Sequence, residues 1–360
     1  MLSNLIASSF ILLLSSFQAS SVFLTGDLLE QWLGAPCSSV TKLHLSGKSI
    51  EAIDPAAFQA CTSLIELDLS KNSLTKLEPD TFKPLTKLEK LVLCDNQIQA
   101  VDSSSFRGLC SLKELDLNRN QLTQLHDPLT LESMKDLQVF QSGFNQISSV
   151  CGRIFQGLSR ARVVRLNNNK IFNLQSETFK DLVSLEELDL SCNSLAYLHP
   201  AAFQLVVNLN TLNLTSNILS FIDSSTFSTL AKLRYLSLGL NKLVWLDTKV
   251  FSGLQSLETL CLSKNDLTTL EKGVFSALVG LKRITLDSNK LVWIELGTFK
   301  DLKSLVYLNM NENRLSELEK SIFDGLSARI ELIGNPISLK DPESVRGLCG
   351  RVASSCQIII

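Results

Sequence analysis

The sequence predicts an α/β-type repeat solenoid, in which short coils stack and place a parallel β-sheet along one side. Three observations lead to this fold. An apolar pattern recurs every 24 residues through most of the chain, an asparagine follows each apolar run, and a phenylalanine follows that asparagine at a fixed distance. Residues 64–87, LIELDLSKNSLTKLEPDTFKPLTK, and residues 88–111, LEKLVLCDNQIQAVDSSSFRGLCS, show the pattern in consecutive copies. A regular period of this length indicates stacked structural repeats.

Each repeat follows the template L-x-x-L-x-L-x-x-N-x-L-x-x-L, then four variable residues, then F-x-x-L. The first repeat begins at Val40 and has Lys48 at position nine, where the others have asparagine. Position nine holds Asn72, Asn96, Asn120, Asn145, Asn169, Asn193, Asn217, Asn241, Asn265, Asn289, Asn313 and Asn335. Position nineteen holds Phe58, Phe82, Phe106, Phe155, Phe179, Phe203, Phe227, Phe251, Phe275, Phe299 and Phe323. The fourth repeat has one extra residue and lacks the phenylalanine. Counted from these positions, the array is expected to have about 12 to 13 coils.

The template assigns a physical role to each position. The leucines at positions four and six lie two residues apart, so they point to the same side of a short strand, while positions three, five and seven face solvent. The asparagine at position nine has two donors and an acceptor, which suit the backbone groups of its own turn and of the next coil. The phenylalanine fills the wall opposite the sheet. Because one coil cannot cover its own apolar face, stability is expected to come from stacking, with capped ends.

With these positions assigned, the chain from Val40 to Asn335 resembles the "typical" extracellular leucine-rich repeat of Toll-type receptor ectodomains, small leucine-rich proteoglycans and the acid-labile subunit of the growth-factor carrier complex. The resemblance implies a leucine-rich repeat horseshoe with its parallel β-sheet on the concave face, a surface that binds other macromolecules. The chain departs from the family at both ends. It lacks the usual cluster of four cysteines before the array, and it lacks the tryptophan and paired cysteines expected after Pro336.

The ends of the chain differ in composition from the array. Residues 1–21 have an apolar stretch, no acidic residue and small residues near their end, which is the pattern of a secretory signal peptide, with Ala19 and Ser21 before the cleavage site. Residues 22–39 are expected to form an N-terminal cap, in which TGDLLEQWLG is helical and Trp32 covers the first coil. The array occupies 40–335, and 336–360 are expected to form a short C-terminal cap or to continue into a longer protein. No later segment is apolar over a membrane-spanning length, so we expect no membrane span.

Nine cysteines give an odd count, which leaves at least one thiol outside an intramolecular pair. Cys37 and Cys61 lie one repeat apart, and equivalent positions of stacked coils are within disulfide range. A disulfide there is one reading, and Cys61 as a substitute for a core leucine is the other. Cys349 and Cys356 are expected to pair with each other. The remaining five are interpreted as free thiols, with Cys94 and Cys261 on the sheet face, where a thiol offers a route to a homodimer.

Composition and motifs argue against several kinds of chemistry. The 34 Lys and Arg nearly balance 36 Asp and Glu, so no basic surface for nucleic acid is predicted. With three histidines and no phosphate-binding or metal-spaced motif, we expect no cofactor and no metal. Acidic pairs do recur on the predicted sheet face, and paired carboxylates are what a glycosidase needs. The exposed strand sequence ELDL explains them more simply. They are Glu66 with Asp68, Glu114 with Asp116, and Glu187 with Asp189.

The sheet face is where a binding site is predicted. Aromatic and arginine side chains are the usual anchors of protein interfaces, although each alone is explained by local packing. As a set, Phe144, Arg165, Tyr235 and Tyr307 predict a protein-binding surface. One glycosylation sequon begins at Asn213, on the same face, where a glycan would redirect binding to a flank or an end of the array.

The sequence therefore predicts a secreted, non-enzymatic protein that binds an extracellular protein or glycoprotein ligand by complementarity on a rigid surface. A structural or adhesive role in the extracellular matrix, favoured by self-association, is an alternative. Recognition of microbial surfaces in innate immunity is another. An enzyme would require the acidic pairs to converge in a cleft, and an intracellular scaffold would require the leader to be retained.

Overall fold

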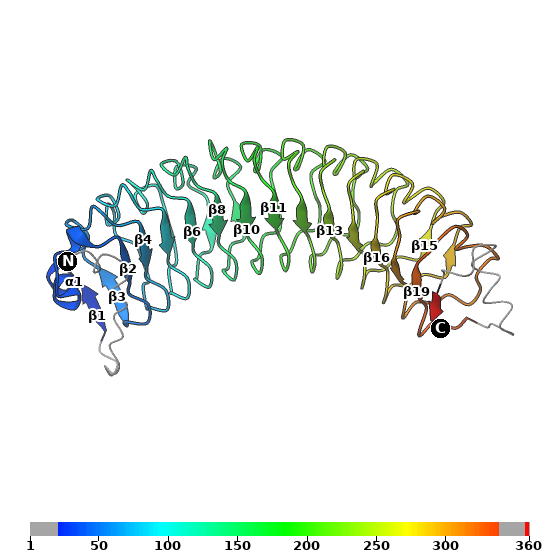
Figure 1. The fold of residues 1–360 in the computed structure, drawn as a ribbon, viewed down its shortest axis with the longest axis horizontal. Coiled ribbons are helices and arrows are strands. Elements are labelled where there is room, and N and C mark those ends of the chain that lie inside the picture. Colours follow the sequence, from blue (N-terminus) through cyan, green and yellow to red (C-terminus); the bar gives the residue numbers. More distant parts are fainter. Residues whose placement is uncertain (1–20, 338–356, 360) are drawn as a thin grey trace, which may run out of the picture. The chain divides into compact units, whose positions relative to one another are not determined.

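The computed structural model describes residues 21–337 and 357–359 and divides the chain into two compact units, which we describe separately. The N-terminal unit extends to Lys170, and the C-terminal unit begins at Ile171. Both are built of stacked coils with a parallel β-sheet, so the predicted repeat solenoid is confirmed (Figure 1). We number the coils by their repeats, so that coil 1 begins at Val40 and coil 9 contains Asn241 at position nine.

The N-terminal unit contains the cap and coils 1 to 6. One helix, α1 (Gly26–Leu33), and one 3-10 turn, η1 (Cys37–Ser39), precede the array. The main sheet runs in the order β2 (Lys42–His44), β4 (Glu66–Asp68), β5 (Lys90–Val92), β6 (Glu114–Asp116), β8 (Val139–Gln141) and β10 (Val163–Arg165). Two small parallel pairs lie beside it, formed by β1 (Val22–Leu24) with β3 (Ile50–Ile53) and by β7 (Gln124–Leu125) with β9 (Ser149–Val150).

The C-terminal unit contains coils 7 to 13, together with the last residues of coil 6. Its sheet runs in the order β11 (Glu187–Asp189), β12 (Thr211–Asn213), β13 (Tyr235–Ser237), β14 (Thr259–Cys261), β16 (Arg283–Thr285), β18 (Tyr307–Asn309), β19 (Arg329–Glu331) and β20 (Gln357–Ile359). A second parallel pair, β15 (Thr269–Leu270) with β17 (Trp293–Ile294), lies apart from this sheet. Among the residues that the structure describes, no α-helix follows α1.

Strand register follows the repeat, residue for residue. In the C-terminal unit Leu212 pairs with Leu236, and Leu236 with Leu260, so each position-four leucine stacks on its equivalents. These leucines are fully buried, while the residues on either side of them are at least partly exposed in β12 and β14, and Tyr235 but not Ser237 is exposed in β13. The predicted alternation is thus observed, because a side-chain period of two sends every second residue of a strand into the core.

The asparagines form a continuous hydrogen-bond ladder in each unit. Asn96 Oδ1 accepts from the Leu74 N–H at 3.0 Å, and its Nδ2 donates to the carbonyls of Leu93 and Leu69, each at 3.0 Å. Leu69 and Leu74 belong to the preceding coil, not to the next one as predicted. Coil 1 has Lys48 in place of the asparagine, and no earlier coil offers a carbonyl to an asparagine there. The Lys48 backbone N–H donates to Asn72 Oδ1 at 2.9 Å.

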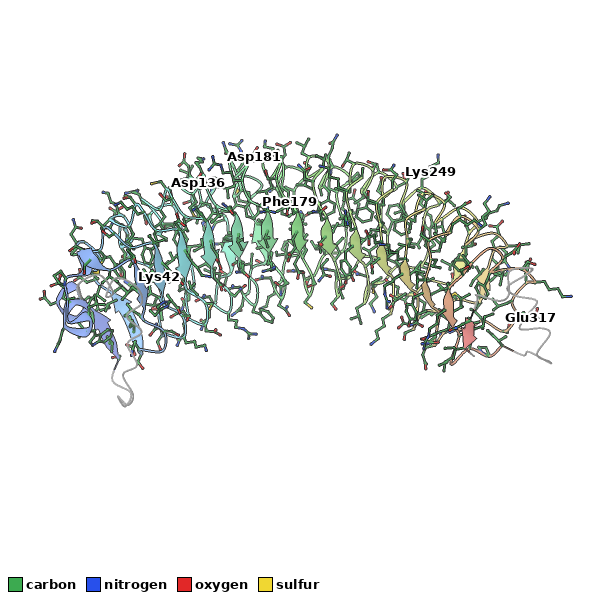
Figure 2. The ribbon with its side chains drawn as sticks, in the orientation of Figure 1. Lys42, Asp136, Phe179, Asp181, Lys249 and Glu317 are labelled. Carbon is green, nitrogen blue, oxygen red and sulfur yellow. A yellow bond between two sulfur atoms is a disulfide. The ribbon has the colours of Figure 1, made fainter. Side chains whose placement is uncertain are left out.

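Phenylalanines stack through the interior opposite the sheet. In the C-terminal unit the ring centroids of Phe179 and Phe203 lie 6.3 Å apart, and those of Phe203 and Phe227 are also 6.3 Å apart. Figure 2 shows Phe179 inside the unit, with Asp181 and Lys249 on the loops at its outer edge. Coil 4, which lacks the aromatic residue, buries Leu131 and Met134 instead. An extra residue thus shifts the apolar positions by one and keeps them in the core.

Position eight, just before the asparagine, has left-handed backbone in every coil. Its φ lies between 53° and 57° at all non-glycine examples, from Lys71 to Glu312, and Gly47 and Gly334 hold the first and last copies. No Val, Ile or Thr occupies this position, because a β-branched side chain is a steric outlier at positive φ. The template assigns position eight to the rim of the sheet but does not predict this conformation.

The N-terminal cap closes coil 1 through a helix, a disulfide and an added strand. Thr25 caps α1 by accepting from the Leu28 N–H at 3.2 Å, and the helix buries Leu29 and Leu33. Trp32 is partly exposed, and the prediction that it covers coil 1 stays a prediction. Cys37 and Cys61 form the predicted disulfide, with their Cα atoms 4.7 Å apart.

The described C-terminal residues end in a strand that the sequence did not reveal. Strand β20 pairs with β19 in parallel, and the Leu332 N–H donates to the Ile359 carbonyl at 2.7 Å. This pairing covers the exposed edge of the last coil, an edge that sheets need to protect. The predicted signal peptide, and the predicted bridge between Cys349 and Cys356, lie outside the described residues.

Two buried threonines allow a prediction about stability. Thr226 and Thr298 occupy equivalent buried positions, but the Thr298 hydroxyl donates to the Glu295 carbonyl at 2.7 Å, whereas the Thr226 hydroxyl has no partner. Thr226→Val should therefore raise the free energy of unfolding by about 1 kcal/mol, because an unpaired polar group leaves the core. Thr298→Val should lower it by a similar amount, as measured by urea denaturation. Equal shifts of both variants in one direction would contradict this account.

Candidate functional site

The outward face of the N-terminal sheet begins with paired charges. At position three, Lys42 contacts Glu66 at 3.0 Å, and Lys90 contacts Glu114 at 3.0 Å across neighbouring strands. Glu114 raises the pKa of Lys90 through a hydrogen bond. Such partly exposed pairs contribute little to stability. The next two strands carry valine at this position, so the paired charges end before β8.

An aromatic and arginine cluster lies where the paired charges end. Phe144 is 44% exposed, and the Arg119 guanidinium lies 4.4 Å from its ring centroid. Both side chains belong to position eight of adjacent coils and share its left-handed backbone. On the next coil, Arg165 Nη1 donates to Gln141 Oε1 at 3.0 Å. Phe144 and Arg165 thus lie on adjacent coils, and Arg119, which sequence reasoning missed, contacts the Phe144 ring.

In the C-terminal unit, Tyr235 projects from the middle of the sheet face. Its side chain is 39% exposed and lies between Thr211 and Thr259, the residues in register on either side. Because both neighbours are small, the ring rises above them. Leu240, at position eight of the same coil, is also exposed. Tyr235 is thus accessible on this surface, and its role as a binding anchor stays a prediction.

Tyr307 is held in a network, not left free. Its hydroxyl donates to Glu331 Oε2 at 3.1 Å, and the Arg283 guanidinium lies 4.7 Å from its ring centroid. Arg329 Nη2 in turn contacts Glu331 Oε1 at 2.7 Å. Burial, followed by the hydrogen bond to Glu331, raises the pKa of Tyr307. The network fixes the ring, so Tyr307 offers a preorganised face. Tyr235 and Tyr307 belong to the C-terminal unit, whereas Phe144 and Arg165 belong to the N-terminal unit.

Asn213 lies on strand β12, directly beside the Tyr235 strand. Its Oδ1 accepts from the Thr215 N–H at 3.1 Å, and the Thr215 hydroxyl contacts the Ser237 hydroxyl at 2.5 Å. Register pairs Asn213 with Ser237, two residues after Tyr235. A glycan on Asn213 would therefore stand next to Tyr235 and restrict access to it. Its occupancy stays a prediction.

The acidic pairs have structural partners. The aspartates at position five accept hydrogen bonds from the backbone two residues later, an Asx contact that holds the chain as it leaves the strand. The bonds are Ser70 N–H to Asp68 at 2.8 Å, Asn118 N–H to Asp116 at 2.9 Å, and Ser191 N–H to Asp189 at 2.9 Å. Burial raises the pKa of Asp116. Local support for strand ends thus accounts for the aspartates of the ELDL sequences.

The free thiols differ in accessibility. Cys94 and Cys261 lie on the sheet faces and are partly buried, while Cys110 and Cys192 are exposed. Burial, helped by the nearby Asp116, raises the pKa of Cys94 to about 12. Since the thiolate is the reactive form, Cys94 is a poor candidate for joining two chains.

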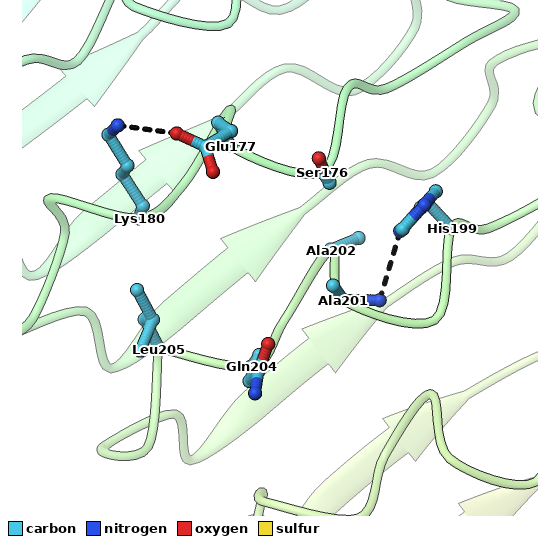
Figure 3. Close-up of a pocket in the computed structure, with 8 residues that line it drawn as sticks. All are labelled: Ser176, Glu177, Lys180, His199, Ala201, Ala202, Gln204 and Leu205. Atoms are coloured by element: carbon cyan, nitrogen blue, oxygen red, sulfur yellow. Dashed lines mark hydrogen bonds and ion pairs between the residues drawn. The ribbon is translucent and has the colours of Figure 1, made fainter.

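A small pocket in the C-terminal unit does not assemble catalytic groups. It is lined by Ser176, Glu177, Lys180, His199, Ala201, Ala202, Gln204 and Leu205 (Figure 3). Lys180 is paired with Glu177, and His199 Nδ1 accepts from the Ala201 N–H at 3.1 Å. This imidazole performs the turn-capping role that aspartate has at the same position of other coils, as when Asp223 accepts from the Ser225 N–H at 2.8 Å.

The described residues contain neither a metal-binding cluster nor a membrane-spanning helix. No three His, Cys, Asp or Glu side chains there are grouped to hold a metal ion. Within residues 21–337 and 357–359, no helix has both the length and the apolar character needed to cross a membrane.

One exposed surface escaped the sequence analysis because it lies on the flank and not on the sheet. At position thirteen, the C-terminal unit carries Tyr197, Phe221, Trp245 and Trp293, all exposed. Each looks unremarkable within its own repeat. Comparing position thirteen between successive repeats would have revealed the set, because equivalent positions of stacked coils are spatial neighbours.

Comparison with protein families identifies the repeat. The leucine rich repeat model matches residues 38–93, 86–147, 159–219, 207–267, 241–291 and 280–337. The chain belongs to the leucine-rich repeat family. A comparison with curated proteins gives no match. The resemblance inferred from positions four, six, nine and nineteen is confirmed.

Solved leucine-rich repeat structures share the fold. A leucine-rich repeat protein of Leptospira interrogans is 28% identical, with a TM-score of 0.72 over 86% of this chain and 76% of that chain. Drosophila Toll, in its complex with Spatzle, is 23% identical with a TM-score of 0.73, covering 90% of this chain and 48% of that one. This chain thus spans about half of that Toll structure. A chain from the complex of Latrophilin 3, Unc5D and the leucine-rich repeat part of FLRT2 is 22% identical, with a TM-score of 0.66 over 80% of this chain and 87% of that chain.

Proposed function

We propose that this leucine-rich repeat chain is a secreted, non-enzymatic binding protein whose sheet face takes a protein or glycoprotein ligand. The cluster of Arg119, Phe144 and Arg165 is the first contact site, and Tyr235 with Tyr307 forms a second surface on the other unit. Recognition relies on complementarity to side chains that the sheet already holds in place, so little conformational entropy is lost on binding.

The exposed ring of Phe144 carries the proposal. Its left-handed backbone is shared by position eight of every coil, so what distinguishes Phe144 is a large aromatic side chain that is 44% exposed and adds little to the core. The Arg119 guanidinium lies against the ring. Exposed aromatic and arginine side chains are also the residue types most enriched among interface hot spots.

Other observations support binding and export. Toll was solved in a complex with Spatzle, and FLRT2 in a complex with Unc5D and Latrophilin 3, so structures with this fold engage protein partners. Export is supported by the apolar leader pattern of residues 1–21 and by the Cys37–Cys61 disulfide, a bond typical of oxidising compartments. The structural roles of the position-five aspartates support a function without catalysis.

Binding is tested with a panel of extracellular ectodomains displayed as multivalent probes. Phe144→Ser should weaken a detected interaction by about 30-fold, because loss of a hot spot costs roughly 2 kcal/mol or more. Lys71→Ser is the matched control, since Lys71 is exposed at position eight with the same backbone conformation and should leave the affinity unchanged. Thermal unfolding of both variants verifies that the fold is intact. Equal affinities of the two variants for every ligand found would refute the proposed site.

Export is tested by the intact mass of the protein released from a eukaryotic host, before and after enzymatic glycan removal. We expect a mature chain that starts near Val22 and contains the Cys37–Cys61 bridge. A loss of mass on glycan removal would show that Asn213 is occupied. Retention in cells with the leader attached and all thiols free would overturn secretion and favour an intracellular scaffold.

A further inference from the structure

The C-terminal unit has an apolar stripe on one flank. After the asparagines of coils 7, 8, 9 and 11, the chain runs along this flank with positions eleven and fourteen buried and positions twelve and thirteen exposed. In coil 9, Leu243 and Leu246 are buried, while Trp245 is 48% exposed. We define the flank stripe as Tyr197, Phe221, Val244, Trp245, Val292 and Trp293, all exposed.

Two members of the stripe are in contact, with the ring centroids of Phe221 and Trp245 5.6 Å apart. In the next coil, position thirteen is Thr269, a partly exposed residue in register with Trp293 through the β15–β17 pair. The stripe therefore extends from coil 7 to coil 11, with a threonine in place of an aromatic residue at coil 10. It ends at Glu317, labelled in Figure 2, which holds position thirteen of coil 12.

The fold does not require these aromatic residues. The equivalent positions of the first five coils hold small or polar residues, namely Ala52, Lys76, Ala100, Gln124 and Ser149. Yet the stripe contains two of the three tryptophans of the chain. Exposed contiguous apolar surface is rare in soluble proteins and marks interaction sites.

Charges of opposite sign border the stripe on its two sides. Position ten provides Lys242 and Lys290, and position fifteen provides Asp247 and Glu295. Both lysines are exposed, and both acidic side chains are partly exposed. Position ten of coil 10 is Asp266, and its negative charge is neutralised by Lys290, which contacts it at 2.6 Å. The stripe is thus apolar in the middle and acidic at position fifteen on one side, and its other side carries Lys242 and the Lys290–Asp266 ion pair at position ten.

We propose that the flank stripe is a homodimer interface, in which two copies of this chain pack face to face about a two-fold axis that runs along the stripe. This axis places each coil opposite its own equivalent and exchanges the two margins. Lys242 of one copy then meets Asp247 of the other, and Lys290 meets Glu295, each contact occurring twice. A two-fold axis across the stripe would instead oppose lysine to lysine. Charge complementarity therefore selects both the occupant and the symmetry.

The size of the stripe predicts a weak dimer. Four half-exposed aromatic side chains offer roughly 400 Å² of surface, taking about 200 Å² for a whole side chain. With the valines and the charged margins, each copy would bury on the order of 600–800 Å², the low end for a specific interface. The arrangement of an apolar core and a charged rim is that of ordinary protein interfaces.

The dimer is tested by sedimentation velocity of the full secreted chain over a range of micromolar concentrations. The exposed Cys110 and Cys192 are replaced by serine, so that no disulfide joins the copies. We expect a reversible monomer–dimer equilibrium that Trp245→Ser or Trp293→Ser weakens at least tenfold. Tyr235→Ala, on the sheet face, is the control that should leave it unchanged and separates this interface from the proposed ligand site.

A charge exchange tests the symmetry. Lys242→Glu alone opposes two acidic pairs, and Asp247→Lys alone opposes two basic pairs, so each variant should be monomeric. In an equimolar mixture both contacts become attractive, and a heterodimer should form. Asp247 also accepts from the Lys249 N–H at 2.7 Å, so thermal unfolding must show that its variant is folded. The proposal would be overturned by a parent chain that is monomeric or by a dimer whose affinity the tryptophan substitutions do not change. It would also be overturned if the equimolar mixture of the two charge variants stays monomeric.

Discussion

Asn241→Ala is expected to lower the free energy of unfolding by about 3 kcal/mol, because it leaves a buried backbone donor without a partner. Asn241 Oδ1 accepts from the Leu219 N–H at 3.0 Å. Its Nδ2 donates to the carbonyls of Leu214 and Leu238, each at 3.0 Å. Asn241 and Leu219 are both buried, so water cannot replace these bonds. Urea denaturation, read as the shift of the midpoint at constant slope, measures the loss.

The loss is limited by the way the ladder is built. The Leu214 carbonyl also accepts from Asn217, and the Leu238 carbonyl also accepts from Asn265. Each carbonyl therefore keeps one partner in the variant, while the Leu219 N–H keeps none. The control is Asn173→Ala, an exposed asparagine of the same unit, which should change stability by less than about 0.5 kcal/mol. Equal losses for the two variants would show that the ladder contributes no more than a surface amide.

Asn241→Asp separates the acceptor from the donors. The carboxylate can still accept from Leu219, but it would face carbonyls where the amide donated, so the loss at neutral pH should exceed that of the alanine variant. Burial raises the pKa of such a carboxyl in the folded state. The folded state then binds a proton more tightly than the unfolded state, so part of the stability should return as the pH falls through the folded pKa. A stability independent of pH would contradict this.

Most of the fold was predictable because each repeat position has one physical role. The leucines at positions four and six and the phenylalanine at nineteen are buried wherever the template puts them, and a single insertion in coil 4 moves the core to Leu131 and Met134. The left-handed backbone of position eight was missed because residues as different as Lys71 and Phe144 occupy it. Its only trace in the sequence is the absence of β-branched residues. Strands β1 and β20 were missed because they pair with distant segments and have no repeat of their own.

The candidate sites were predictable one residue at a time but not as groups. Phe144 and Arg165 were named from their types and positions, whereas Arg119 gains its role only by lying against Phe144. It holds the same repeat position one coil earlier, so comparison between coils would have found it. Tyr307 differs again, because Arg283 and Glu331 approach it from neighbouring strands and hold a partly exposed ring in place. Side-chain geometry of this kind is not contained in a repeat template.

Phe227→Ala is expected to lower the free energy of unfolding by about 3–5 kcal/mol, the cost of emptying a large buried aromatic site. Phe227 is fully buried, and its ring is stacked on Phe203 at a centroid distance of 6.3 Å and an angle of 17°. The alanine variant would lose the transfer free energy of the buried ring. It would also leave a cavity beside Phe203, on which the ring is stacked. Phe227→Leu, which keeps most of the volume, should lose less.

Phe221→Ala is the matched control, because Phe221 belongs to the same coil but is exposed on the flank. It should cost less than about 1 kcal/mol, since exposed sites away from the core tolerate substitution. Hydrogen exchange adds a spatial test. Each coil of a solenoid is stabilised chiefly by its neighbours, so amide protection should fall first in coils 7 to 9, around Phe227, and less in coils 11 and 12. Equal losses of stability for Phe221→Ala and Phe227→Ala would contradict the account, because these two phenylalanines differ in burial and not in residue type. A uniform fall in amide protection would mean that the unit unfolds as one cooperative block.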